Sequence, residues 1–341
     1  MDNNVSTQDV LTLEDRLENQ KIEEKKELKE LRSTANYIGL AMFMFLVLTS
    51  IIMSIAGLLK RYNVYDPNLY NGDFLGLKPE VYYLLYGTAF MASLFIPFLF
   101  AAKMCRVSLS DTIRFEKADR NCIIPYAGVG LIFFALMNYF VDLLIHILNS
   151  NGIYPKSSSL PYDNSPLSII LYVISIAVLP ALFEEFAFRG VSLGLLRKYG
   201  DTFAIVASSV LFGLIHANIY QIPFAFVGGL YFGYLIIKTN SLLPGIIMHF
   251  INNLFCSMIT IISNNSSISD EVLNNTVNAI FIVIGIISLV YLLKKKGKDA
   301  FKVSNYISPI GLSKRVQAFY LSPLVVLFII FIVVVVGNSF V

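Results

Sequence analysis

A pair of carboxylates and an arginine stand in an otherwise apolar run. Glu184 and Glu185 are followed by Arg189, and Pro180 precedes them. On a helix, Glu185 and Arg189 lie one turn apart and can form an ion pair, whereas Glu184 points about 100° away. Pro180 removes one helical hydrogen bond and predicts a kink beside Glu184. A carboxylate without a cation in apolar surroundings is a candidate general acid or base, so we assign that role to Glu184.

Two further patterns each contain a histidine. Phe212 precedes His216 by four residues, and His249 precedes Asn253 by four, so each pair shares one helix face. A single histidine on an apolar helix is more often a packing residue than a catalytic one. At helical rise, however, Glu184, His216 and His249 lie about 21, 22 and 14 Å from the same membrane border. This similar depth favours one common site.

The segments that carry these patterns are apolar enough to cross a membrane. Hydrophobic residues make up 56% of the 341 residues and charged residues 14%, whereas a soluble domain carries about 25% charged residues. Nine apolar spans of roughly membrane-crossing length occur at 35–59, 81–102, 123–148, 166–188, 202–217, 221–238, 241–263, 276–293 and 318–337. The sequence predicts an all-α polytopic membrane helix bundle with about eight or nine transmembrane helices, of which the fifth and sixth are short. Gly229 and Gly233 predict close helix packing in the sixth.

The basic residues are distributed unevenly between the predicted loops. With a cytoplasmic N-terminus, only four of the 26 Lys and Arg residues fall outside: Lys60, Arg61, Lys78 and Lys156. The positive-inside rule therefore predicts a multi-pass cell-membrane protein with its N-terminus in the cytoplasm. The net charge of only +3 and the absence of a basic–aromatic patch argue against a nucleic-acid partner.

Taken together, the three motifs resemble those of the CPBP family, which contains CAAX prenyl endopeptidases and bacteriocin-processing or immunity proteins, also called Abi. The resemblance covers about 165–265, and every motif residue is present: Glu184, Glu185, Arg189, Phe212, His216, His249 and Asn253. Charge, hydropathy and this resemblance together predict four parts of the chain: a charged cytoplasmic segment (1–34), N-terminal transmembrane helices (35–160), a CPBP-like catalytic core (161–265) and C-terminal transmembrane helices (266–341).

The resemblance implies an intramembrane peptidase that forms no covalent acyl-enzyme and acts on a peptide or membrane-protein substrate within the lipid bilayer. By analogy, Glu184 and His216 position and deprotonate a water molecule, and His249 and Asn253 donate hydrogen bonds to the oxyanion. The structural supports of such a site are Glu185, Arg189 and Phe212. CAAX-type, peptide-precursor or bacteriocin processing and self-immunity are the functions that the resemblance offers.

Two alternatives remain open at this stage. Glu184, His216 and His249 also form a two-histidine, one-glutamate set of the kind that binds catalytic zinc. The chain has no HExxH helix, so we expect no cofactor and keep zinc as the alternative. The long regions outside the motifs leave room for a different function, that of a non-catalytic bacteriocin-immunity or adaptor membrane protein.

Overall fold

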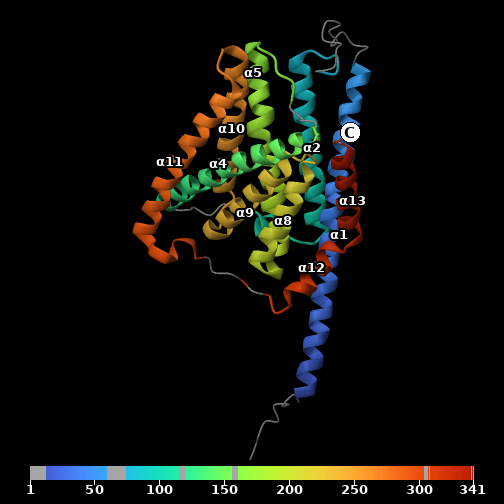
Figure 1. The fold of residues 1–341 in the computed structure, drawn as a ribbon. Coiled ribbons are helices and arrows are strands. Elements are labelled where there is room, and N and C mark those ends of the chain that lie inside the picture. Colours follow the sequence, from blue (N-terminus) through green and yellow to red (C-terminus); the bar gives the residue numbers. More distant parts are fainter. Residues whose placement is uncertain are drawn as a thin grey trace, which may run out of the picture.

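The computed structural model describes residues 13–59, 74–114, 120–155, 160–302, 306, 308–338 and 340. Every regular element of these residues is helical (Figure 1). The helices are α1 (Leu13–Leu59), α2 (Pro79–Met104), α3 (Leu109–Thr112), α4 (Arg120–Ser150), α5 (Pro166–Val173), η2 (Ile174–Val178), α6 (Leu179–Glu184), η3 (Glu185–Ser192), α7 (Leu193–Leu196), η4 (Arg197–Tyr199), α8 (Asp201–Ile215), α9 (Gln221–Thr239), α10 (Leu243–Asn265), α11 (Asp270–Lys296), η5 (Gly297–Phe301), α12 (Leu312–Tyr320) and α13 (Pro323–Asn338).

The predicted all-α membrane bundle is confirmed. By length and composition, seven helical stretches among the described residues could cross a membrane: Asp15–Ile55, Pro79–Met104, Ile123–Ser150, Pro166–Tyr199, Gln221–Thr239, Leu243–Asn265 and Asp270–Phe301. An eighth span is possible if α12 and α13, which are bent by 68° relative to each other, are counted as one. The chain is therefore a multi-pass membrane protein.

Of the nine predicted spans, the fifth is short, as predicted, and the ninth is broken. The fifth, α8, has only 15 residues, because the chain turns at Ala217, whose φ is +47°. The ninth is broken before Pro323, the first residue of α13, since proline cannot supply the N–H that would continue the preceding helix. The number of transmembrane helices therefore depends on whether α8 and the bent pair of α12 and α13 are each counted as a span.

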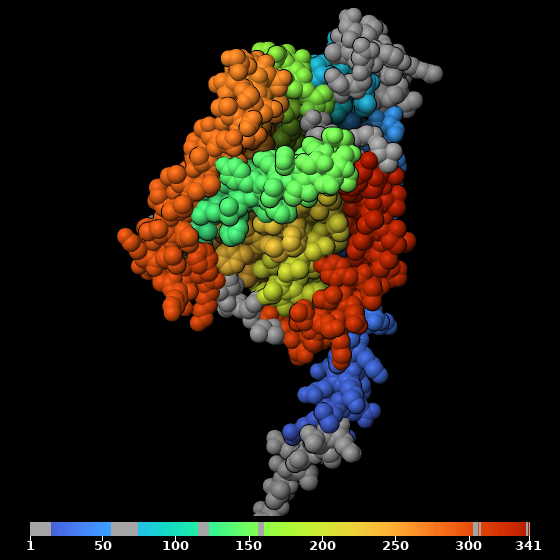
Figure 2. Space-filling view, viewed as in Figure 1, coloured from blue at the N-terminus to red at the C-terminus, as the bar shows by residue number. Residues whose placement is uncertain are grey.

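The helices pack around the segment that runs from α5 to η4. Helix α1 contacts α2, α12 and α13, and its N-terminal half projects from the bundle in Figure 1. Helices α8 and α9 pack together, and α10 contacts η2, α6 and α9. Helix α4 packs on α11 and α9 and crosses this face at a steep angle to α5, partly covering α8 and α9 in Figure 2. The fourth span is therefore enclosed by helices from both halves of the chain.

The predicted close packing at the sixth span is confirmed. A Cβ atom at Gly229 would lie 2.9 Å from the Ser209 Cβ and 3.2 Å from Arg189 Nη2. A Cβ atom at Gly233 would lie 3.1 Å from the Cγ2 atom of Ile205. These glycines allow the backbone of α9 to approach α8 and the Arg189 side chain closely.

We expect Gly229→Ala to destabilise the protein by about 1–3 kcal/mol, because the added methyl overpacks this contact. Its neighbour provides a matched control: a Cβ atom at Gly228 would have only an ordinary contact, at 3.6 Å from Phe134 Cε1. Gly228→Ala should therefore leave stability unchanged or raise it slightly, since alanine favours a helix. Thermal unfolding of both variants in detergent checks this, and equal stability would contradict the packing argument.

Candidate active site

A proline in the fourth span leaves a backbone carbonyl oxygen to which Asn253 binds. The span contains two π-helical segments, η2 and η3, which flank the short helix α6. Pro180 has no N–H to donate to the carbonyl oxygen of Ile176, four residues earlier. The Nδ2 atom of Asn253 donates to that oxygen at 3.1 Å. The hydrogen bond to the carbonyl that Pro180 leaves free thus connects the fourth span to α10.

The expected ion pair one turn apart is present. Arg189 Nη1 donates to Glu185 Oε1 at 2.9 Å, and the two side chains are 1% and 0% exposed. The guanidinium carbon of Arg189 lies 3.9 Å from the centroid of the Phe212 ring and 5.2 Å from that of Phe232. A buried guanidinium is stabilised both by the carboxylate and by the ring faces. Phe212 therefore contacts the arginine, as a supporting residue would.

His249 lies between the two carboxylates. Its Nδ1 contacts Glu185 Oε1 at 2.9 Å, and its Nε2 lies 3.6 Å from Glu184 Oε2. The ring stacks on Phe232 with centroids 5.6 Å apart. The Glu185 contact fixes the ring so that Nε2 is directed to Glu184, in the way that a carboxylate orients a catalytic histidine.

Glu184 is buried and keeps a carboxylate oxygen without a hydrogen bond. The Oε2 atom has no hydrogen-bond partner within the described part of the chain, and 3.6 Å to His249 is too long for one. A buried polar atom left unsatisfied is costly unless a ligand or water completes it. Glu184 therefore presents an acceptor beside an imidazole nitrogen, which suits the binding of a water molecule.

His216 joins the site through Phe212. Its Nδ1 lies 2.8 Å from the Phe212 carbonyl oxygen. Because a carbonyl oxygen can only accept, Nδ1 carries the proton and Nε2 of the neutral ring is an acceptor. The Phe212 ring meets His216 and His249 edge-on, at centroid distances of 5.1 and 5.9 Å. None of the ion pairs found in the described ranges includes His216.

Three contacts of the site were not predicted from the sequence. Phe232 stacks on His249, the Ile176 carbonyl binds Asn253, and a Cβ atom at Gly245 would lie 3.0 Å from Glu185 Oε2. Phe232 lies three residues after Gly229 on α9, but aromatic residues are common in membrane helices, so spacing gives no specific signal. The roles of Gly245 and Ile176 depend on backbone contacts between helices.

The set proposed for zinc is not assembled as a ligand set. Among the described residues, no group of three or more His, Cys, Asp or Glu side chains is placed so that it could hold a metal ion. Glu184 and His249 approach each other, but His216 directs Nδ1 to a backbone carbonyl.

Comparison with known proteins finds a family model that matches the segment with these residues. The family model for the Type II CAAX prenyl endopeptidase Rce1-like proteins matches residues 166–255. The resemblance to the CPBP family is confirmed. The Rce1-like segment contains all seven motif residues and all the contacts described above, and it lies within the predicted core at 161–265.

A curated relative supports the same relationship. The chain is 27% identical over 147 residues to the membrane-embedded CAAX protease MroQ of Staphylococcus aureus (strain USA300). The match covers 41% of this chain and 59% of MroQ, so the chain spans about three fifths of the length of this relative. No solved structure matches the chain.

Proposed function

We propose that the protein is an intramembrane endopeptidase that hydrolyses a peptide bond in a membrane-associated peptide or protein. The observation that carries this proposal is the unpartnered Glu184 oxygen beside His249 Nε2 in a buried part of the Rce1-like segment. A base, an oriented imidazole and a low-dielectric environment are the requirements for activating water without a covalent intermediate.

In the proposed mechanism, Glu184 accepts a proton from water while Nε2 of His216 accepts the second hydrogen bond and orients the molecule. The water oxygen attacks the peptide carbonyl carbon, and the carbonyl becomes a tetrahedral oxyanion. His249, whose Nδ1 contacts Glu185, donates Nε2–H to this oxyanion. Asn253 donates through the Nδ2 hydrogen that Ile176 does not use. Glu184 then gives this proton to the peptide nitrogen as the oxyanion collapses to a carboxylic acid, the C–N bond breaks and the amine leaves.

The relative and the membrane setting support a proposal for the substrate class. MroQ is named as a CAAX protease, and we propose the same broad class here: CAAX-type proteins, peptide precursors or bacteriocins at the membrane. The basic loops support a cytoplasmic N-terminus, with substrate entering from the cytoplasm or laterally from the inner leaflet. No cofactor is part of the proposal.

Cleavage by the purified full-length protein tests this function. Quenched-fluorescence peptides with a CAAX-type C-terminus, farnesylated or unmodified, would be presented in detergent micelles with and without EDTA. We expect cleavage that persists in the chelator. Loss of cleavage in EDTA and its recovery with zinc would contradict the acid–base mechanism and favour the metal-dependent one.

The orientation of the chain can be measured by thiol labelling in a background without native cysteines. Lys198 and Ser267 are both exposed, at opposite ends of the proposed core. We expect a membrane-impermeant maleimide to label Ser267→Cys in intact cells and Lys198→Cys only after permeabilisation. The reverse pattern would contradict a cytoplasmic N-terminus.

Asn253→Ala should lower kcat by about 10²–10³ and leave residual activity, because one oxyanion donor is lost. The substitution also removes the bond to Ile176, so folding must be measured alongside turnover. Asn264→Ala is the matched control, since Asn264 is an exposed asparagine on the same helix. Full activity of a folded Asn253→Ala protein would contradict the oxyanion role.

A further inference from the structure

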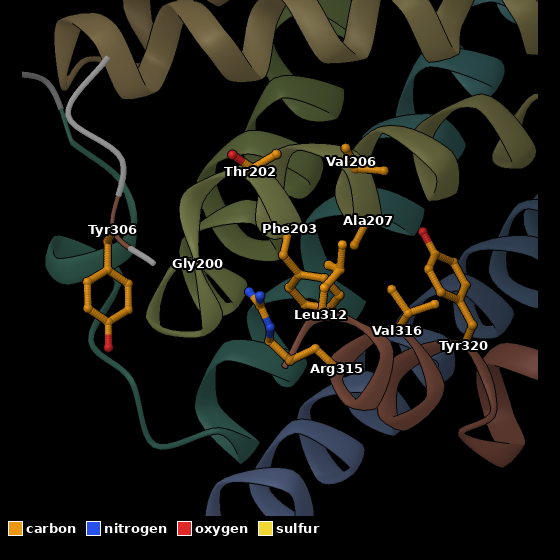
Figure 3. Close-up of a pocket in the computed structure, with 10 residues that line it drawn as sticks. All are labelled: Gly200, Thr202, Phe203, Val206, Ala207, Tyr306, Leu312, Arg315, Val316 and Tyr320. Atoms are coloured by element: carbon orange, nitrogen blue, oxygen red, sulfur yellow. The ribbon is translucent and has the colours of Figure 1, made fainter. Parts of the chain in front are cut away.

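A pocket lies between α8 and α12, apart from the Glu184 site. It has a volume of about 380 Å³, within the range of small-molecule sites. Figure 3 shows that its walls are mostly apolar side chains, including Phe203 and Val206 from α8 and Leu312 and Val316 from α12. The pocket contacts the first turns of α8, whereas His216 follows the other end of that helix.

Arg315 supplies a positive charge in this apolar setting. Its side chain is 8% exposed, and its Nη1 donates to the backbone oxygen of Tyr199. Its Nε has no hydrogen-bond partner in the residues that the structure describes, and none of the ion pairs found there includes it. Asp201 is engaged elsewhere, by Arg197 Nε at 2.9 Å and the Tyr306 N–H at 3.1 Å.

The Tyr199 carbonyl and the Phe203 ring, whose centroid lies 5.6 Å from the guanidinium carbon, stabilise Arg315 but do not neutralise its charge. A buried guanidinium without an anion remains unfavourable. An anion from outside the chain that reaches the guanidinium group would neutralise the charge. The apolar walls around it would at the same time accept a hydrocarbon chain. The two features together fit an amphiphile with an anionic head.

The composition of α12 and its bend relative to α13 favour a position at the level of lipid headgroups. Helix α13 is almost entirely apolar in sequence, whereas α12 combines Leu312 and Val316 with Lys314 and Arg315. The bend of 68° between them directs α12 away from the axis of α13. A short amphipathic helix bent at the end of an apolar one is typical of the membrane interface.

We propose that this pocket binds an anionic membrane phospholipid. The phosphate contacts Arg315, and the beginning of an acyl chain lies against Phe203, Val206 and Val316. The site is independent of peptide hydrolysis, because none of the motif residues lines it.

Binding of a fluorescent phosphatidylglycerol to the purified full-length protein in detergent micelles tests the proposal. We expect saturable binding, stronger than that of the matching phosphatidylcholine probe. Arg315→Gln should weaken binding by about tenfold or more, the typical effect of losing a charge-assisted hydrogen bond. Lys314→Gln removes the same charge from an exposed neighbour and should change binding by less than about twofold.

A second variant covers the possibility that Arg315→Gln does not fold. Leu312→Trp adds bulk to the pocket wall and leaves the contact between Arg315 and Tyr199 in place, so it should also weaken phosphatidylglycerol binding. Leu321→Trp is its control, since both leucines are highly exposed, at 60% and 70%, and Leu321 does not line the pocket. Thermal unfolding verifies that each variant is folded.

Three results would overturn the proposal. The first is undiminished phosphatidylglycerol binding by folded Leu312→Trp protein or by folded Arg315→Gln protein. The second is equal binding of the phosphatidylcholine probe. The third is complete displacement of the lipid probe by millimolar inorganic phosphate, which would indicate a site for free anions instead of a lipid.

Discussion

Glu184→Gln should yield a folded protein without measurable turnover. The amide has nearly the volume of the carboxylate but cannot accept a proton from water, and loss of a general base lowers rates by about 10²–10⁴. Folding should survive, because the side chain found against Glu184 in the described part of the chain, His249, lies at 3.6 Å, beyond hydrogen-bond distance. The rate of peptide cleavage and thermal unfolding, measured on one preparation, check both parts.

The matched comparison is the same substitution at the adjacent carboxylate, Glu185→Gln. If Glu184→Gln is the poorly folded variant and Glu185→Gln the stable inactive one, the roles of the two residues are the reverse of those proposed here. If folded Glu184→Gln protein retains full activity, water activation by this residue is wrong.

Glu185→Gln should reduce stability by about 3–5 kcal/mol, the effect of removing one partner of a buried ion pair. Glu185 Oε1 contacts both Arg189 Nη1 and His249 Nδ1 at 2.9 Å. Its neutralisation would leave Arg189, which is 1% exposed, without its ion-pair partner. We expect a low yield of folded protein and a large decrease in the unfolding temperature in detergent.

An exposed pair provides the control for Glu185→Gln. Glu30 and Lys198 interact at 3.1 Å with about half of each side chain exposed, and such pairs contribute about 0–1 kcal/mol. Glu30→Gln should therefore unfold at nearly the temperature of the unmodified protein. Similar stability of the two variants would show that the buried pair does not hold this part of the fold.

Local spacing explains why part of the site could be predicted. The contact between Glu185 and Arg189 follows from the helix period alone, and the Phe212 carbonyl is the acceptor one turn before His216. The position of His249 between two carboxylates could not be predicted in this way. It depends on how closely α10 approaches η3, which Gly245 permits at a place where a Cβ atom would lie 3.0 Å from Glu185 Oε2.

The same distinction applies to the fold. Hydropathy identified the membrane helices because a bilayer requires long apolar segments. It did not show that α1 extends without interruption from Leu13 to Leu59, so that most of the charged segment predicted at 1–34 belongs to the same helix as the first span. The charged half of α1 forms contacts of its own, including ion pairs of Glu24 with Lys314 and of Glu30 with Lys198, and these partners are distant in sequence.

Mass spectrometry of protein and peptide termini in the membranes of producing cells tests the central claim most directly, because every membrane-associated peptide or protein in the cell is then a candidate substrate. Cells with the wild-type protein would be compared with cells that contain Glu184→Gln at the same level. We predict new termini of membrane-associated peptides or proteins in the wild-type sample that are absent from the variant. Identical sets of termini at equal protein levels would contradict an intramembrane endopeptidase.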